Sequence, residues 1–217
     1  MKHIILTFNI KKLSILVLLI VASIQCSYSQ ITFGFKLGLN QSKVQSNLEE
    51  IDYTNRRGLF SGAIVQAKLT EKRFVRMEVL YSVKGSKFLA IPDYTSVGKS
   101  NFNYLNIPLL QGYRPIKNLS IVLGPEIGYL ISAKSRHDSK EIDITEEYNK
   151  FDLAADLGLG YQITPLFGIE ARYSYGFKLM NIYYEYDIQG KTRGDKKYDG
   201  ANRVLQFGLT YHFVKKE

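Results

Sequence analysis

The sequence has little of what redox proteins and metalloenzymes are built from. Its 217 residues include one cysteine, three histidines and no tryptophan. Cys26 and His3 both fall within the first 29 residues, so without that segment the chain has no thiol and only two histidines. Disulfides and thiolate metal sites are thereby excluded from the remainder. No metal-ligand spacing, phosphate-binding loop or dinucleotide fingerprint occurs either, so we expect no metal and no cofactor.

Long apolar runs are missing as well, apart from one near the start of the chain. The first 29 residues carry three lysines and no acid, then the apolar run 13–24, and end with Ser-Tyr-Ser. This order is typical of a secretory signal peptide with a small-x-small cleavage site. An uncleaved membrane anchor is the alternative, but the run is shorter than the ~20 apolar residues that a spanning helix needs. We therefore predict a signal peptide over 1–29 and one domain over 30–217.

Basic residues outnumber acidic residues in this chain. The formal charge is +9, and removal of 1–29 takes away three lysines and no acid, which leaves +6. Such an excess suits contact with lipopolysaccharide, the phosphorylated glycolipid of bacterial outer membranes; the alternative is that the basic residues are spread over exposed loops. The basic residues do not gather with stacking aromatics on one polar face, so nucleic acid is not an expected partner.

What the chain has in abundance is alternation of period two. In the segment 31–39 every odd position is a large apolar residue, while Thr, Gly, Lys and Gly fill the even positions. That is the period of a strand whose two faces meet different surroundings, and not the period of a helix. Seven further segments repeat it, at about 58–70, 74–84, 104–113, 119–132, 151–163, 167–179 and 205–213.

The connections between these segments alternate in length. Long polar stretches at 41–57, 87–101, 134–149 and 181–202 alternate with short turns. This is the pattern of long external loops and short periplasmic turns, and it puts both termini on the periplasmic side of the outer membrane. We predict an all-β fold, an eight-stranded antiparallel up-and-down transmembrane β-barrel. A soluble β-sandwich is the alternative; it explains the periodicity but not the rhythm of the connections.

Tyrosine and phenylalanine must supply any aromatic girdle, because tryptophan is absent. Rings at the membrane boundary lie in lipid while their hydroxyl groups reach the head groups. Six tyrosines fall on the apolar face near one end of a predicted strand: Tyr81, Tyr113, Tyr129, Tyr161, Tyr173 and Tyr211.

The opposite face of the predicted strands collects charges. An eight-stranded bore is only wide enough for side chains to fill it, and isolated ions buried there are costly, so the charges must pair. We expect a salt-bridged plug; the alternative is a path for ions or protons. The candidate network spans four of the predicted strands and comprises Arg76, Glu78, Glu126, Asp152, Asp156, Glu170 and Arg172.

Six stretches form a recognisable set: FGFKLGLN at 33–40, EVLYSVKG at 78–85, YLNIPLL at 104–110, LGPEIGYL at 123–130, EARYSYG at 170–176 and NRVLQFGLTYHF at 202–213. Together they resemble the PorT-type outer-membrane β-barrel family over essentially all of 30–217. The resemblance implies an eight-stranded barrel in the outer membrane of Gram-negative bacteria. It also implies that Pro108 and Pro125 are expected features, although a proline inside a strand by itself predicts a bulge or a local break. The founding member is linked to protein secretion, which the resemblance alone does not carry over to this chain.

The sequence favours an interaction role over catalysis. His137 lies beside Asp138, but adjacent residues in a polar loop are usually just solvated, so we expect no enzyme. The leading hypothesis is a monomeric barrel with a structural or interaction role, whose loops contact an envelope or extracellular protein. The alternatives are a small transport pore or accessory component of secretion, and an enzyme acting on lipid or peptide. The candidate contacts lie in 181–202 and are residue types that anchor interfaces: Tyr183, Tyr184, Tyr186, Arg193 and Tyr198.

Overall fold

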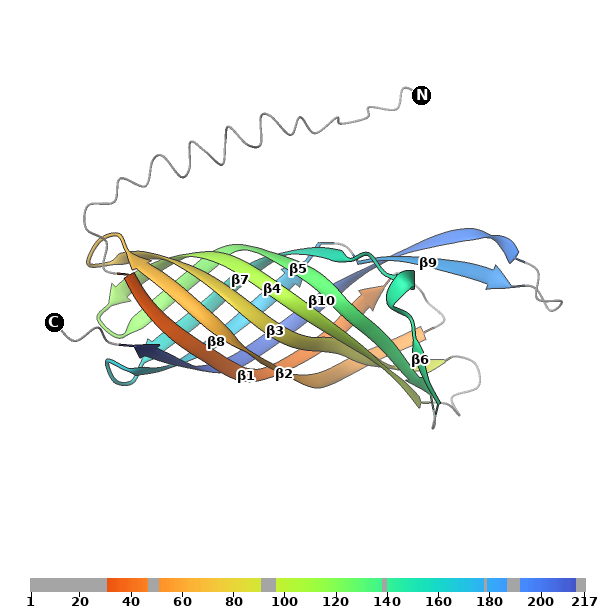
Figure 1. Ribbon diagram of the computed structural model, residues 1–217, viewed down its shortest axis with the longest axis horizontal. Coiled ribbons are helices and arrows are strands. Elements are labelled where there is room, and N and C mark those ends of the chain that lie inside the picture. The colour runs from red at the N-terminus through yellow and green to blue at the C-terminus, as the bar shows by residue number, and fades with distance from the viewer. Residues whose placement is uncertain are drawn as a thin grey trace, which may run out of the picture. The chain divides into compact units, whose positions relative to one another are not determined.

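The computed structural model places a closed β-barrel within the compact unit Ile31–Glu217 (Figure 1). The backbone is described for 31–46, 51–90, 97–137, 140–177, 179–186 and 192–213. Side chains are described for 31–45, 53–87, 98–136, 141–146, 148–177 and 200–213. The predicted signal peptide, 1–29, lies outside the described residues.

Ten strands and one short 3-10 helix follow one another along the described chain. They are β1 (Ile31–Ser46), β2 (Ile51–Lys68), β3 (Arg73–Ala90), β4 (Val97–Ile116), β5 (Leu119–His137), β6 (Lys140–Asp143), η1 (Thr145–Glu147), β7 (Phe151–Gln162), β8 (Phe167–Gly176), β9 (Leu179–Tyr186) and β10 (Thr192–Phe213). Among the residues that the structure describes, no helix is long and apolar enough to cross a membrane.

Eight of the strands form a ring in the order β1-β2-β3-β4-β5-β7-β8-β10. Each pairs antiparallel with the next, and β10 closes the ring on β1 in a register that runs from Phe33 opposite Phe213 to Ser46 opposite Gly200. The two other strands lie outside the ring: β6 pairs with β5, and β9 pairs with the first part of β10. The predicted eight-stranded antiparallel barrel is therefore confirmed.

The two ends of the barrel differ. At the end that we call the turn end, the connections 69–72, 117–118 and 163–166 link neighbouring strands directly. At the other end, which we call the extended end, β9 and β10 project beyond the ring as a two-stranded ribbon (Figure 1). The element η1 and the strand β6 also lie at this end.

The two faces of the ring have opposite chemistry. In β7 burial alternates strictly from Phe151 to Gly160, with odd positions pointing outward and even positions inward. Large apolar side chains on the outer face, such as Leu157 at 55%, are exposed in the isolated chain, whereas the lumen face buries lysines, arginines and carboxylates. A soluble protein shows the reverse, so this distribution is that of a barrel whose outer face meets lipid.

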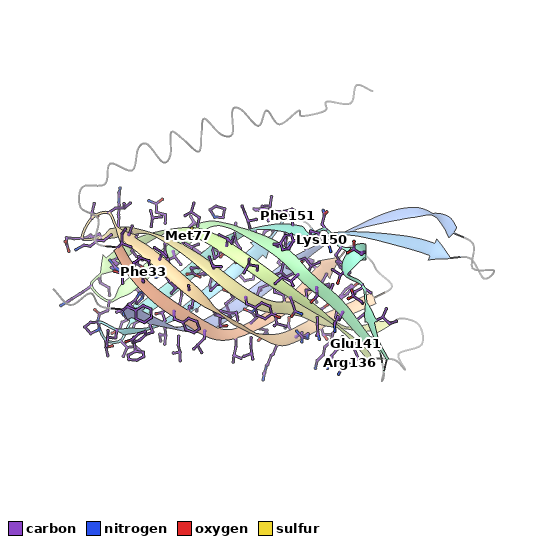
Figure 2. The ribbon with its side chains drawn as sticks, viewed as in Figure 1. Phe33, Met77, Arg136, Glu141, Lys150 and Phe151 are labelled. Carbon is purple, nitrogen blue, oxygen red and sulfur yellow. The ribbon has the colours of Figure 1, made fainter. Side chains whose placement is uncertain are left out.

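Aromatic rings mark both ends of the apolar outer face. Phe33 lies toward the turn end and Phe151 toward the extended end (Figure 2). Phe151 packs edge-on against Tyr129, with ring centroids 5.4 Å apart. The stretch from Phe151 to Tyr161 in β7 covers ~34 Å along the strand, or ~26 Å along the axis at a tilt of ~40°. That height matches the ~25 Å apolar band of outer-membrane barrels, and the rings sit where girdles are expected.

The strands run further than the apolar alternation predicts. β3 has 18 residues and β10 has 22, and only 47–50, 91–96 and 187–191 separate strands at three of the four places where long loops were expected. At the fourth, β6 and η1 occupy most of 138–149. The loop boundaries predicted from the sequence were therefore wrong. Beyond the apolar band both faces of a strand meet water, so the hydrophobic alternation ends while the hydrogen-bonded ladder continues.

The two prolines behave as the strand rules predict. Pro108 lies opposite Glu78 in β3, and the pairing of β3 with β4 skips two positions there, between the pairs Met77–Leu109 and Leu80–Asn106. The pairing of β4 with β5 skips the position of Pro125 in the same way. In both ladders the register is the same on either side of the gap, so each proline causes a local break and not a bulge.

Candidate functional site

The lumen is the part of the molecule where the chemistry is concentrated. In the ring of eight strands, β3 and β8 are four positions apart in both directions, so they face each other across the bore. Arg172 of β8 donates from Nη2 to Glu78 Oε1 of β3 at 2.7 Å. Arg76 of β3 donates from Nη1 to Glu170 Oε2 of β8. Two ion pairs therefore span the full diameter of the barrel.

Two further charged residues complete this arrangement. Lys36 of β1 lies with Nζ 2.5 Å from Glu170 Oε1 and 3.5 Å from Glu78 Oε2. Arg172 Nη1 lies 3.3 Å from Asp156 Oδ2 of β7. All six side chains are at most 6% exposed. We call them the cross-bore cluster: Lys36, Arg76, Glu78, Asp156, Glu170 and Arg172.

The cross-bore cluster is electrically balanced. Three cations face three carboxylates, and each cation forms ion pairs with at least two of the carboxylates. Buried ions are tolerated when they are paired and their hydrogen-bonding groups are used; an unpaired ion in the same place is strongly destabilising. The cluster therefore links strands on opposite sides of the ring and fills the bore at this level.

Two of the predicted network residues lie outside this cluster. Glu126 Oε1 accepts hydrogen bonds from Lys84 Nζ at 2.9 Å and from Asn106 Nδ2 at 2.7 Å. Asp152 Oδ2 accepts one from Asn202 Nδ2 at 2.7 Å. These five residues form what we call the second polar layer. The sequence thus predicted one network where the structure has two separate groups.

Apolar side chains lie inside the barrel beyond each polar group. Phe74, Leu110 and Val122 pack together on the side of the turn end. On the side of the extended end, Tyr148, which follows η1, packs against Phe102 with ring centroids 4.8 Å apart. The rest of this second apolar cluster comprises Val44, Tyr104, Leu130 and Ala133. The lumen is therefore filled with side chains in successive layers, as expected for a ring of eight strands.

The network predicted from the sequence left out four of these participants: Lys36, Lys84, Asn106 and Asn202. Lys36 falls on the lumen face by its parity, which was visible in the sequence, but nothing in the sequence tells that its ammonium reaches carboxylates of β3 and β8. Asn106 and Asn202 carry no charge, so a search for charged lumen residues did not identify them. Of the other lumen charges, Lys68 pairs with Glu71 at the turn end, at 2.6 Å.

The predicted loop contacts lie in paired strands and not in a loop. Tyr183, Tyr184 and Tyr186 belong to β9, and Arg193 and Tyr198 belong to β10. In the register of this ribbon Tyr183 is opposite Lys196 and Tyr184 is opposite Asp195, while Arg193 falls where the register shifts. The side chains of these five residues lie outside the described part. The first part of β10 pairs with β9, from Thr192 and again from Asp195 onward, before the strand enters the ring at Gly200.

Exposed charges at the extended end form a small group between β5 and β6. Glu141 accepts hydrogen bonds from Lys134 Nζ at 2.9 Å and from Arg136 Nη2 at 2.8 Å. Arg136 and Glu141 lie at the tip of this end (Figure 2). The hydrogen bond from Lys134, with that from Arg136, lowers the pKa of the Glu141 carboxyl below its ordinary value. These groups lie outside the apolar band and face water.

The two histidines that follow residue 29 lie on different strands of the ring. His212 is buried on the lumen face near the turn end, and its Nδ1 has no hydrogen-bond partner. His137 ends β5, and its side chain is outside the described part. Within the described ranges, no group of three or more histidine, cysteine, aspartate or glutamate side chains could hold a metal ion.

A family model and several solved structures resemble this chain. The model of the family described as "outer membrane protein beta-barrel domain" matches residues 25–182. Among solved structures, Neisserial surface protein A gives a TM-score of 0.50 at 14% identity, over 83% of this chain and 97% of that chain. The Ail protein of Yersinia pestis gives 0.48 at 18% identity, over 84% and 98%. The comparison with curated protein sequences gives no match. At these identities the likeness to solved structures concerns the fold alone.

Proposed function

Since the chain belongs to the outer membrane protein beta-barrel domain family, we propose that it is a non-conducting barrel that binds an envelope or extracellular protein through its extended end. In this proposal 1–29 is a signal peptide that is removed, both termini are periplasmic, and the extended end faces the cell exterior. The barrel is monomeric and contacts lipid and lipopolysaccharide along its outer face.

The cross-bore cluster is the observation that carries this proposal. A conducting pore needs a continuous water-filled path, and narrow barrels lack one when side chains occupy the bore. Here the bridges Arg172–Glu78 and Arg76–Glu170 join strands on opposite sides of the ring, and their side chains are almost fully buried. Apolar side chains pack on both sides of the polar groups. The lumen is built as an internal support, which leaves the surfaces beyond the membrane for recognition.

The ribbon of β9 and β10 is the surface best suited to recognition. β9 pairs with β10 on one side, and no strand pairs with its other edge among the described residues. An edge strand presents a row of unpaired backbone N–H and C=O groups, onto which a strand of another protein can add. Tyrosine and arginine side chains on the same ribbon are suited to anchor such a partner.

Shortening this ribbon tests the proposal. Met180 lies opposite Asp199 in the ribbon register, so residues 181–198 can be replaced by Asn-Gly, which closes two facing strands with a two-residue turn. Pairing of β10 with β1 begins at Gly200, so the shortened chain keeps the whole ring and is expected to assemble. We expect cross-linking from intact outer membranes to recover fewer partners with this variant than with the parent.

A second variant separates backbone pairing from side-chain recognition. It keeps the ribbon at full length and replaces by threonine the five predicted contacts, Tyr183, Tyr184, Tyr186, Arg193 and Tyr198. Retention of the partner by this variant assigns binding to the edge of β9, and its loss assigns binding to the side chains. If the shortened barrel assembles and captures every partner of the parent, the extended end is not the binding surface.

Within this family, we infer that the chain belongs to the PorT-type barrels. The support is the set of six stretches between 33 and 213, which lie in the strands of the ring. No catalytic step is part of the proposal, and a role in secretion is not inferred. Loss of secreted proteins in a deletion strain, restored by the parent chain, would add secretion to its role.

A further inference from the structure

The second polar layer of the lumen contains several hydrogen-bond acceptors that no donor reaches. Both asparagine amides donate to carboxylates: Asn106 to Glu126 and Asn202 to Asp152. Each carboxylate receives its donors on one oxygen only. Four buried oxygens consequently have no hydrogen-bond partner: Asn106 Oδ1, Asn202 Oδ1, Glu126 Oε2 and Asp152 Oδ1.

This layer also carries an excess of one negative charge. Lys84 faces two carboxylates, Glu126 and Asp152, which are 1% and 3% exposed. The neighbouring cross-bore cluster is balanced within itself and offers no spare cation. A buried charge without compensation is strongly unfavourable, so the layer requires one more positive charge.

Two residues of this layer lie at one level of the lumen, on either side of a glycine. Asn106, Gly128 and Asp152 are directly opposite one another on β4, β5 and β7, in neighbouring strands that are ~4.8 Å apart. A Cβ atom on Gly128 would lie 3.2 Å from Asn106 Oδ1, 3.3 Å from Tyr104 Cδ1 and 3.5 Å from Asp152 Cβ. The absence of a side chain at Gly128 therefore lets Asn106 and Asp152 lie close together here, beside the ring of Tyr104.

We propose that Asn106, Glu126, Asp152 and Asn202 bind one monovalent alkali cation, such as Na⁺, at this level of the lumen. Carboxylate and amide oxygens are the ligands that hard cations prefer. The valence follows from the charge count, because a single positive charge balances the layer whereas a divalent ion would leave an excess of the opposite sign. The cation joins β4, β5, β7 and β10 and so has a structural role, independent of partner binding at the extended end.

Thermal unfolding of the refolded barrel in detergent tests the proposal. Midpoints are compared in NaCl and in N-methyl-D-glucamine chloride of equal ionic strength, since the organic cation is too large for the layer. We expect NaCl to raise the midpoint in a saturable way, by ~5–10 °C at a hundredfold excess over its dissociation constant. Asp152→Asn removes the excess charge and is expected to abolish the difference between the salts. Asp143→Asn, a change of the same type at an exposed site, is expected to keep it.

Gel filtration of the parent barrel after exposure to radioactive sodium provides a second measurement that needs no variant. We expect one sodium ion to be retained per barrel, because apolar side chains pack on both sides of the polar groups. Equal midpoints in the two salts together with no retained sodium would overturn the proposal. An infrared band of a protonated carboxyl in the parent in NaCl, lost in Asp152→Asn, would also overturn it, because a proton would then supply the missing charge.

Discussion

Arg172 provides the sharpest test of how the cross-bore cluster stabilises the barrel. Its guanidinium contacts Glu78 at 2.7 Å, Glu170 at 2.6 Å and Asp156 at 3.3 Å, and its side chain is fully buried. Arg172→Met keeps much of the side-chain volume but leaves three carboxylates against two cations. Breaking a buried ion pair from one side costs about 3–5 kcal/mol, so we expect a loss of that size in the free energy of unfolding.

The double variant Arg172→Met with Asp156→Asn distinguishes charge imbalance from lost packing. It leaves Lys36 and Arg76 against Glu78 and Glu170, which they already contact, so the cluster is balanced again. We expect it to recover ~1–3 kcal/mol of the loss, as coupled neighbours do in a double-mutant cycle.

Urea unfolding in detergent, followed by far-UV circular dichroism, measures both variants, and Lys134→Met at the exposed extended end serves as the control. A loss below ~1 kcal/mol for Arg172→Met, or no recovery in the double variant, would refute the view that paired charges brace the barrel.

Further predictions concern the two faces and the exposed rim. Leu157→Arg on the outer face should cost ~2–4 kcal/mol in lipid, whereas Gln162→Arg should cost less; equal unfolding free energies would show that the faces are misassigned. Hydrogen bonds from Lys134 and Arg136 lower the pKa of Glu141, so its contribution to stability is present above the ordinary glutamate pKa and is lost as the pH falls through the lowered one. An NMR titration of Glu141 is expected to show this lowered pKa, and Lys134→Gln is expected to move it back toward the ordinary value; an unchanged pKa in the variant would contradict the assigned cause.

The membrane-facing part of the fold was predictable because lipid and lumen impose one hydrophobic period on every strand. Leu157 and Asp156 are adjacent in sequence, and their opposite faces follow from parity alone. The extension of β10 back to Thr192 was not predictable in this way, since residues such as Asp195 and Lys196 give no alternation where both faces meet water. The ladder there depends on pairing with β9, which is a property of the register and not of local composition.

The partners of the lumen charges were only partly predictable. The odd–even alternation along each strand assigns Lys36, Glu126 and Asp152 to the lumen. The tilt of the strands decides which of these residues lie at the same height in the bore and can contact one another. Glu126 consequently pairs with Lys84 and not with the arginines of the cross-bore cluster. The up-and-down order predicted from the sequence already puts β3 across from β8, but the stagger between the strands is not contained in a single sequence.

Conductance of the purified barrel in a planar lipid bilayer tests most directly whether the lumen is closed by its own side chains. The parent is expected to insert without any steady current, because the bridge from Glu78 to Arg172 crosses the full bore. The variant with both residues changed to alanine is expected to stay closed as well, because the second polar layer and the apolar clusters on both sides still fill the bore. A reproducible ohmic conductance in the parent would contradict the account.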